Sequence, residues 1–311
     1  MSSVSPARPG LSFADDPRAT RTGTVAAVAA YSIWGFFPLL FNLLDGVDPG
    51  LIVAHRVIWS LLIAGGILAI AGRMDEVSAA LRDRGALLRL LASAAILSMN
   101  WLIYVWAVLN GRVLETSFGY FLNPLVNVAL GMILLGERQN RLQWVAIAIA
   151  SVAMAIQAVG VGGIPFVAIS LAVTFAVYGY IRKTVGASST TSLFVECLVL
   201  VPFALAYVGW SIATSGPGPH AVPGLLAALV FTGPATTIAL LMFAYGVKRL
   251  RLSTIGMLQY IAPSIQFVLA IAVFGEELNA TRLVSFALIW LSLVIFTADS
   301  LRQHRNAVHA G

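Results

Sequence analysis

Long apolar stretches dominate the chain, and short polar segments separate them. A helix that spans the hydrocarbon core of a bilayer needs about 20 consecutive apolar residues. Ten stretches of about that length occur, at 24–44, 50–71, 87–109, 113–135, 142–159, 164–181, 190–213, 222–247, 252–274 and 282–299. The pattern therefore predicts an all-α polytopic membrane protein with ten transmembrane helices in the lipid bilayer.

The composition agrees with this pattern. Of the 311 residues, 59% are hydrophobic and 10% are charged, whereas a soluble domain carries about 25% charged residues. The net charge of +6 does not indicate nucleic-acid binding, because the charges are few and no basic face is interleaved with aromatic residues. We expect no nucleic-acid partner.

The basic residues give the chain an orientation. If the ten spans alternate in direction, one side of the membrane receives nearly all of the Lys and Arg residues in the connections. They are Arg8, Arg18, Arg21, Arg73, Arg82, Arg84, Arg138, Arg141, Arg182, Lys183, Lys248, Arg249, Arg251, Arg302 and Arg305. The other side receives Arg112 and Arg282. Because cytoplasmic loops collect Lys and Arg, both termini are predicted to be cytoplasmic: a disordered tail at 1–22 and a C-terminal tail at 300–311.

Several kinds of chemistry have no signature in the chain. The single cysteine, Cys197, has no partner for an internal disulfide. The four histidines are scattered and form no cluster with metal-ligand spacing. No GxxxxGK[ST] loop for nucleotide phosphates is present. We therefore expect no metal, no cofactor and no use of ATP by this chain.

The chain resembles itself when it is shifted by 139 residues. The stretches RVLETSFGYFLNPLVNVALGMILLGE and RLSTIGMLQYIAPSIQFVLAIAVFGE then overlap. The identical pairs include Arg112 with Arg251, Pro124 with Pro263, Gly136 with Gly275, and Glu137 with Glu276. With slightly larger offsets, YSIWGF resembles FAVYGY and LIVAH resembles LFVEC. Internal similarity of this kind indicates two structural repeats.

The predicted repeats cover 23–160 and 161–299, with five helices each. Since five is odd, the second repeat enters the membrane from the opposite side, so the two repeats are inverted. Inverted repeats are typical of secondary transporters, in which the two halves open a central site alternately to either side. The alternative is that the duplication records only the origin of the fold.

Polar residues recur on one face of two equivalent predicted helices. In the span 113–135 they are Tyr120, Asn123 and Asn127, around Pro124; in the span 252–274 they are Gln259 and Gln266, around Pro263. Spacings of three and four residues place such side chains on one helix face, and a proline in a helix interior kinks it. We interpret these residues as the lining of a substrate cavity, with kinks at both prolines.

The span 87–109 adds Asn100 and Tyr104, one turn apart, beside Trp101 and Trp106. Aromatic walls with a few polar groups suit an organic small molecule. We therefore add Asn100, Trp101 and Tyr104 to the cavity lining. The alternative is that the polar groups only form hydrogen bonds between helices, which is their common role in membranes.

Four ionisable residues fall within predicted spans: His55, Arg56, Glu115 and Glu196. Charged groups in membrane spans are rare and mark ion or substrate pathways. Arg56 and Glu115 both lie near the outer face and are candidates for an ion pair, while Glu196 lies near the cytoplasmic end. We predict gating or proton coupling for these four residues. For Arg56 the alternative is that the side chain reaches the interface.

At these residues the chain resembles a known family. The segments YSIWGFFPLLF, AHRVIWS, NWLIYVWAVLNGRVLETSFGYFLNPL and GERQNRLQWVAI are similar to the RarD branch of the EamA transporters, in the drug/metabolite transporter superfamily. In ETSFGY, Thr116 and Phe118 depart from the usual string of that branch, which puts substrate preference in doubt. The resemblance implies a bacterial cytoplasmic-membrane protein with ten helices. It also implies secondary transport of small metabolites or drugs, often outward.

The expected function is therefore a secondary transporter, and an exporter on the strength of the resemblance. Its expected partners are a small-molecule substrate and, as the coupling ion, protons; a homodimer is left open. The alternatives are a membrane-embedded enzyme, a channel and a non-transporting scaffold. An enzyme would need an acid–base, nucleophilic or metal constellation, and a scaffold would need exposed domains. Neither is present in the sequence, so we expect no enzyme.

Overall fold

The computed structural model describes residues 17–110, 113–158, 166–273, 275 and 280–310. These residues form helices joined by turns, without a strand among them. The first half contains α1 Pro17–Gly35, α2 Phe37–Asn42, α3 Pro49–Ile70, α4 Met74–Arg82, α5 Arg84–Leu109, α6 Val113–Leu135 and α7 Arg141–Ala158. The second half contains α8 Phe166–Thr184, α9 Ser189–Ser215, the 3₁₀ helix η1 Gly218–Ala221, α10 Pro223–Arg249, α11 Leu252–Gln259, α12 Ile261–Ala272 and α13 Ala280–Ala310.

Seven of the described helical stretches are long and apolar enough to cross a membrane. They are Arg18–Asn42, Pro49–Ile70, Arg84–Tyr104, Phe166–Thr184, Ser189–Ser215, Pro223–Arg249 and Leu252–Leu269. Three shorter apolar helices accompany them, at Gly119–Leu135, Arg141–Ile156 and Leu283–Asp299. The prediction of an all-α, multi-pass membrane protein is thereby confirmed, while the count of ten spans stays a prediction.

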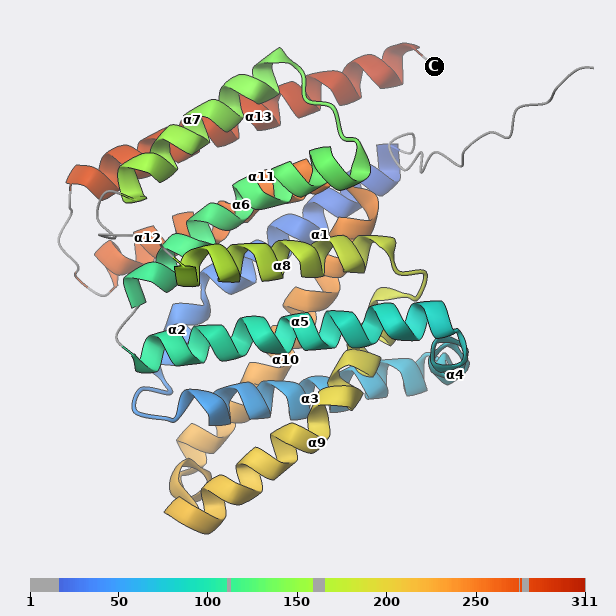
Figure 1. The fold of residues 1–311 in the computed structure, drawn as a ribbon, viewed down its shortest axis with the longest axis vertical. Helices are drawn as coiled ribbons and strands as arrows, with labels where there is room; N and C mark the ends of the chain where they lie inside the picture. Colours follow the sequence, from blue (N-terminus) through green and yellow to red (C-terminus); the bar gives the residue numbers. More distant parts are fainter. Residues whose placement is uncertain (1–16, 111–112, 159–165, 274, 276–279, 311) are drawn as a thin grey trace, which may run out of the picture.

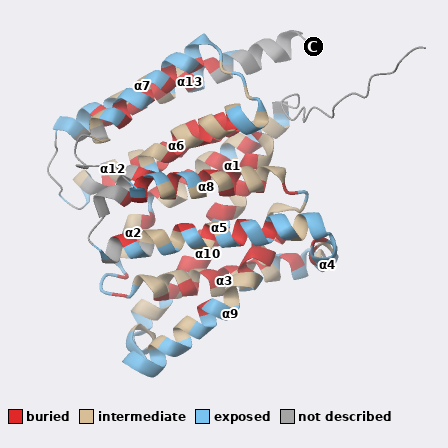
Figure 2. Cartoon of the chain, in the orientation of Figure 1, coloured by how far each residue is buried: buried red, intermediate tan, exposed pale blue. Residues whose placement is uncertain are grey.

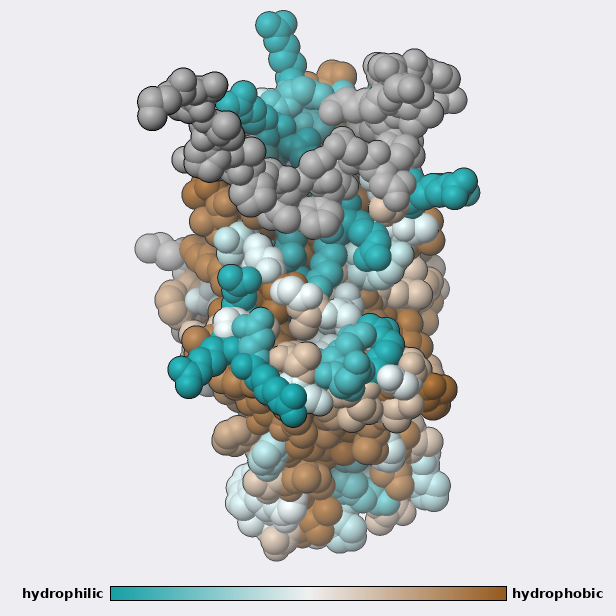
Figure 3. Space-filling model, turned by 90° about the vertical axis from the view of Figure 1, so that its right-hand side faces the viewer, coloured by the Kyte–Doolittle hydropathy of each residue, from teal (hydrophilic) through white to brown (hydrophobic). Residues whose placement is uncertain are grey.

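The long helices lie side by side in a bundle (Figure 1). Helix α1 begins and α13 ends at the same end of the bundle, on the right in Figure 1, where α4 also lies. Helix α8 begins at the other end, so α1 and α8 run in opposite directions (Figure 1). Viewed from the end where α1 begins, hydrophilic residues gather on the surface (Figure 3).

The outer surface of the bundle is largely apolar. Figure 2 shows buried residues on the faces that helices turn toward one another, and exposed residues on the faces that point outward. The outward residues include Ile133 at 75% exposed, Phe203 at 73% and Leu102 at 69%. Such side chains are stable against acyl chains, and the helices satisfy their own backbone hydrogen bonds there. This surface is therefore the one that lipid covers.

Local sequence explains where several helices begin and end. Asp48 precedes Pro49, and its carboxylate accepts a hydrogen bond of 3.0 Å from the backbone N–H of Leu51, which caps α3. Gly136 and Gly275, which the 139-residue shift aligns, have positive φ angles of 65° and 66°. Other L-residues rarely adopt that conformation, so each glycine allows the turn that follows α6 and α12.

One glycine allows α11 to approach α6 closely. A Cβ atom on Gly256 would lie 2.6 Å from the backbone carbonyl oxygen of Pro124 and 2.9 Å from the Cβ of Asn127. Pro124 itself lies inside α6. Pro263 lies in the first turn of α12. The helix is interrupted between α11 and α12, just after Gln259, which precedes Pro263 by four residues. A proline ring clashes with the carbonyl four residues before it, which accounts for the position of that break.

Two lysines fix the helix ends beside the loop that follows α8. Lys183 Nζ donates a hydrogen bond of 3.0 Å to the carbonyl of Val247, at the end of α10. Lys248 Nζ in turn donates one of 3.2 Å to the carbonyl of Val185, just after α8. Cations are favourable at helix C-termini, where carbonyl groups lack partners. The two lysines therefore join the C-terminal ends of α8 and α10 reciprocally.

An aromatic cluster fills the centre, where α1, α8 and α10 meet. Trp34 packs at ring-centre distances of 6.0 Å from Phe175 and 5.6 Å from Phe243. Tyr31 and Tyr178 complete the cluster, each fully buried. The strings YSIWGF and FAVYGY contribute four of these five rings, so the two similar motifs meet in the core.

Candidate functional site

Arg56 lies in α3, and its guanidinium points toward α2, α5 and α10. Its Nε donates a hydrogen bond of 2.9 Å to Oγ1 of Thr236. The guanidinium carbon lies 4.9 Å from the ring centre of Trp101 and 5.8 Å from that of Phe37, which are cation–π distances. The side chain of Glu115 lies outside the described residues, so the predicted Arg56–Glu115 pair stays a prediction.

Two tyrosines lie beside this arginine. The rings of Tyr104 on α5 and Tyr120 on α6 are 6.2 Å apart, and both phenols lie close enough to interact electrostatically with Arg56. Tyr120 remains 44% exposed. The structure thus brings Arg56, Trp101, Tyr104 and Tyr120 together, and the lining of a substrate cavity by these residues stays a prediction.

The predicted amide residues lie inside the bundle and join helices. Asn127 Nδ2 donates hydrogen bonds of 2.9 Å to Asn123 Oδ1 and 3.0 Å to Gln259 Oε1. These three side chains are at most 6% exposed. Gln266 Nε2 donates a hydrogen bond of 3.3 Å to the carbonyl of Trp34. The amides therefore connect α6 to α11 and α12 to α1, and contact with a substrate stays a prediction.

Asn100 has a different set of partners. Its Nδ2 donates hydrogen bonds of 3.0 Å to the carbonyl of Leu171 and 2.8 Å to Oγ1 of Thr174, both on α8. Because an amide nitrogen carries two hydrogens, both donors are used by the protein. This geometry favours the alternative interpretation of Asn100, as a hydrogen-bonding link between α5 and α8.

His55 forms a chain of hydrogen bonds at the end of the bundle opposite the termini. Its Nε2 lies 3.0 Å from Nε2 of His220 on η1, and Trp59 Nε1 donates to its Nδ1 at 3.2 Å. His220 Nδ1 lies 2.8 Å from the carbonyl oxygen of Pro217. His55 is only 6% exposed, so this pair closes one end of α3 against η1.

The partners determine the tautomer of each ring. A carbonyl accepts only, so His220 Nδ1 carries a proton and its Nε2 is the acceptor in the neutral ring. The indole N–H donates only, so His55 Nδ1 is an acceptor and its Nε2–H donates to His220. All four nitrogens are thus satisfied when both rings are neutral. A further proton on either ring would set two N–H groups against each other.

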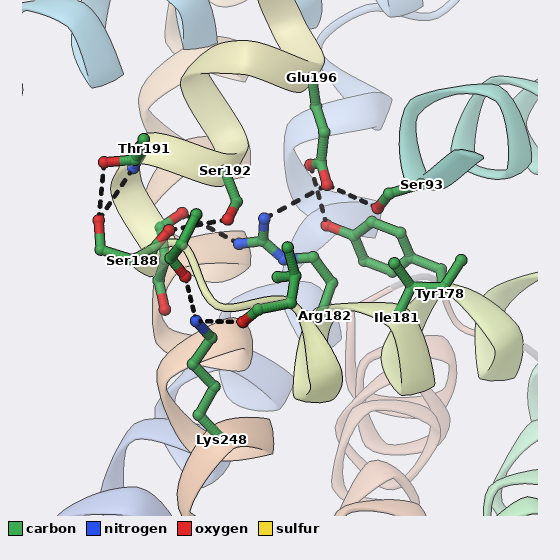
Figure 4. A network of polar contacts seen from close by, with 12 residues as sticks. Ser93, Tyr178, Ile181, Arg182, Ser188, Thr191, Ser192, Glu196 and Lys248 are labelled. Atoms are coloured by element: carbon green, nitrogen blue, oxygen red, sulfur yellow. Dashed lines mark hydrogen bonds and ion pairs between the residues drawn. The ribbon is translucent and has the colours of Figure 1, made fainter. Parts of the chain in front are cut away.

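A buried ion pair lies where α8 ends and α9 begins (Figure 4). Arg182 Nη1 on α8 lies 3.3 Å from Glu196 Oε1 on α9, and their side chains are 0% and 1% exposed. Ser93 on α5 donates a hydrogen bond of 2.6 Å to the same carboxylate oxygen, and the hydroxyl of Tyr178 lies 3.5 Å from the other. Arg182 Nη2 donates to the carbonyl of Ser189 at 3.0 Å. The network joins α5, α8 and α9.

A second carboxylate lies beside this network, on the short helix α4 outside the spans. Glu76 accepts hydrogen bonds from Arg73 at 2.6 Å and from Ser188 and Thr191 at 2.8 Å each. These hydrogen bonds favour the ionised form, and they lower the pKa of Glu76 to about 2, the bond from Arg73 having the largest effect. Glu76 therefore ties α4 to the start of α9 over the whole neutral range.

The predicted position of Arg182 is wrong. The residue was expected in a cytoplasmic loop after the span 164–181, but α8 continues to Thr184 and Arg182 is fully buried. The buried pair with Glu196 explains why: the carboxylate stabilises the guanidinium inside the bundle. No local pattern marks His220 or Thr236 as part of a site, because their partners, His55 and Arg56, lie 165 and 180 residues away.

Comparisons with known proteins agree with this arrangement. The sequence profile of the EamA-like transporter family matches residues 21–158. Protein RarD of Salmonella typhi is 42% identical over 94% of this chain and 99% of its own length. The chain belongs to the EamA transporter family, in its RarD branch. It is accordingly a multi-pass membrane transporter.

Further relatives cover the chain equally well. Protein RarD of Escherichia coli K12 is 39% identical over 94% of this chain and 99% of its own. The chloramphenicol-sensitive protein RarD of Pseudomonas aeruginosa PAO1 is 28% identical over the same shares. A solved crystal structure at 20% identity aligns with a TM-score of 0.72, over 88% of this chain and 96% of its own. That likeness supports the fold alone.

Proposed function

We propose that this transporter is a secondary carrier, an exporter of small organic metabolites or drugs. It works by alternating access across the bacterial cytoplasmic membrane, with both termini in the cytoplasm. In this proposal ten spans form two inverted five-helix repeats. The match to the EamA-like transporter family supports a transporter, and the packing of the described helices supports the mechanism.

The observation that carries the proposal is the symmetry of helix packing. The first repeat would contain α1–α2, α3, α5, α6 and α7, and the second α8, α9, α10, α11–α12 and α13. When every helix is replaced by its equivalent in the other repeat, each major helix–helix contact becomes another contact that is present in the structure. The α1–α10 contact corresponds to α8–α5, the α6–α8 contact to α12–α1, and the α3–α10 contact to α9–α5. The contacts α3–α9, α6–α11 and α7–α13 each join two equivalent helices and therefore correspond to themselves. Together with the opposite directions of α1 and α8 (Figure 1), this supports two inverted halves.

The two polar closures fit such a carrier. The His55–His220 pair lies on the starts of α3 and η1, and the Arg182–Glu196 pair lies where α8 ends and α9 begins. Alternating access requires a closure at each end that can open while the other holds. The His55–His220 contact and the hydrogen bond from Ser93 to Glu196 each join the first repeat to the second, so each can separate when the halves move. We assign gating to both pairs, and proton coupling to His55 and Glu196.

The distribution of charge supports the orientation. The end where α1 begins carries Arg73 and Lys248 among many other basic residues, and its surface is hydrophilic (Figure 3). Cytoplasmic surfaces of membrane proteins collect such residues. In the proposal this end faces the cytoplasm, and the Arg182–Glu196 pair is the inner closure.

Flux measurements in proteoliposomes test the proposal. The purified protein is reconstituted, and a panel of labelled metabolites and antibiotics is followed with and without a pH gradient. We expect saturable flux of at least one compound, faster when the opposite side holds unlabelled compound. Such counterflow is the property of a carrier, and a channel lacks it. A folded protein that moves no compound of the panel, or moves it without counterflow, would contradict the proposal.

Matched variants test the inner closure within the same assay. Glu196→Gln removes a buried carboxylate, while Asp75→Asn removes an exposed one from α4 at the same end. We expect Glu196→Gln to lower the flux and to weaken its response to a pH gradient. Asp75→Asn is expected to leave both unchanged. Equal flux and equal pH response in both variants would remove Glu196 from the gating and coupling mechanism.

A further inference from the structure

The guanidinium of Arg56 has more donors than the protein uses. Its Nε donates to Thr236, and the structure describes no hydrogen-bond acceptor for Nη1 or Nη2. The described ion pairs of the chain involve other arginines: Arg73, Arg182 and Arg251. An arginine has five N–H donors. Within the described part of the chain, four of these donors have no acceptor, and they are available to a bound molecule.

The setting of Arg56 differs from that of the other arginine inside the bundle. Arg182 is fully buried and is held by Glu196 and by the carbonyl of Ser189. Arg56 is only partly buried, and no described carboxylate faces it. A cation within a membrane span is costly, and such residues face a pathway or a partner. Among the described residues no carboxylate balances the Arg56 charge, which therefore fits an anionic ligand.

Aromatic rings hold the guanidinium in place. Trp101 and Phe37 lie at cation–π distances from it, and cation–π contact engages the face of the planar group. The in-plane N–H groups then stay free, and they match the two oxygens of a carboxylate in a bidentate pair. The partly exposed phenol of Tyr120 offers a further hydrogen-bond donor nearby.

An apolar groove on the protein surface borders Phe37, next to the Arg56 guanidinium. A groove of about 290 Å³ lies between α1–α2 and α10, lined by apolar side chains that include Phe37 and Pro234. Phe37 thus borders both this groove and the Arg56 guanidinium. A molecule with an apolar body and a charged end would meet Phe37 at both surfaces.

We propose that the substrate is an amphiphilic organic anion, with a carboxylate that Arg56 binds and an apolar or aromatic body. This inference rests on the proposed function, because it names the substrate class of that carrier. A neutral or cationic substrate would leave the guanidinium desolvated without a counter-charge. Arg56, Tyr104 and Tyr120 form the recognising group, and Trp101 and Phe37 position the arginine.

Matched probes test the charge preference. The probes are 3-phenylpropionate, 3-phenylpropanamide and 3-phenylpropylamine, which share one apolar body and carry a negative, a neutral and a positive end. Binding to the purified full-length protein is measured by equilibrium dialysis, and flux is measured in proteoliposomes. We expect the anion to bind the wild type about 10- to 100-fold more tightly than the amide, as charge-assisted hydrogen bonds allow.

Three variants separate recognition from structure. Arg56→Gln is expected to abolish the preference for the anion, and Arg56→Lys to keep part of it. Thr236→Val removes the tie between α3 and α10 but leaves the cation, so the preference is expected to persist. Arg84→Gln, which removes an exposed arginine at the start of α5, is the matched control for charge.

The results distinguish this inference from the proposed function. If the wild type binds the amide or the amine as tightly as the anion, the inference is wrong, whether or not transport occurs. The inference is also wrong if Arg56→Gln folds and still prefers the anion. If Arg56→Gln does not fold, Arg56→Lys serves as the test: an undiminished preference for the anion in that variant counts against a bidentate pair between Arg56 and the carboxylate. If no compound of the larger panel is transported, the proposed function fails instead.

Discussion

Replacing Arg182 with methionine should destabilise the protein strongly, because it leaves the Glu196 carboxylate buried without its counter-charge. At the observed separation of 3.3 Å, Coulomb attraction amounts to about 5 kcal/mol at an effective dielectric constant of about 20. The hydrogen bond from Ser93 remains in the variant. Breaking a buried pair on one side costs about 3–5 kcal/mol, so we expect a loss of that size for Arg182→Met and for Glu196→Met.

The double variant should recover most of this loss. With both charges replaced by methionine, no ion remains to be solvated, and such replacements are often neutral or stabilising. The sum of the single losses should therefore exceed the loss of the double variant by at least about 3 kcal/mol. The free energy of unfolding is measured by SDS titration of the protein in mixed micelles, followed by intrinsic tryptophan fluorescence.

The exposed pair Arg73–Glu76 is the internal control. Its atoms lie closer, at 2.6 Å, but its side chains are 41% and 34% exposed. Exposed ion pairs contribute about 1 kcal/mol or less. If Arg182→Met costs no more than Arg73→Met, or if the double variant is as unstable as the sum of the singles, burial does not govern this pair and the reasoning is refuted.

Three further outcomes can be measured. The pKa of Glu76 is about 2, below the usual value of 4.5. The Glu76 carboxylate therefore contributes fully to stability above pH 4.5, and its contribution is lost as the pH falls from 4.5 toward 2. The difference in melting temperature between wild type and Glu76→Gln should shrink between these two pH values, and a constant difference would contradict this. Gly256→Ala places a Cβ against the Pro124 carbonyl and should cost about 1–3 kcal/mol of unfolding free energy. Gly66→Ala, which meets open space, should cost nothing, and equal losses would count against the close approach. Hydrogen exchange at 216–222 should be faster in His220→Leu than in wild type at the same pH, because the variant loses the contacts of His220 with His55 and Pro217; equal exchange in both would show that the histidine pair does not hold η1.

Much of the fold could be predicted from the sequence, because lipid imposes a simple rule. A chain in hydrocarbon must satisfy its backbone within each segment, so runs of apolar residues mark helices. The break between α11 and α12 follows from Pro263 in the same local way. The repeat was predicted from matched residues such as Pro124 and Pro263, and its inversion from the odd number of helices in each half. The inversion now rests on the packing symmetry as a proposal.

The site was less accessible to sequence reasoning, because its partners meet only after the helices pack. Nothing near Glu196 in the sequence indicates that Ser93 is its hydrogen-bond donor. The histidine pair joins positions 165 residues apart. A spacing rule could show that Asn123 and Asn127 share a face, but not that Gln259 completes their cluster. Such long-range partners depend on which helices pack together.

The reciprocal bonds of Lys183 and Lys248 restrict how the protein can move. Each lysine anchors the helix of the other, so the C-terminal tips of α8 and α10 are held together as one unit. A passage at that end cannot open between these two tips without breaking both anchors. In the proposed carrier it opens instead where the two halves meet, across the hydrogen bond from Ser93 on α5 to Glu196 on α9.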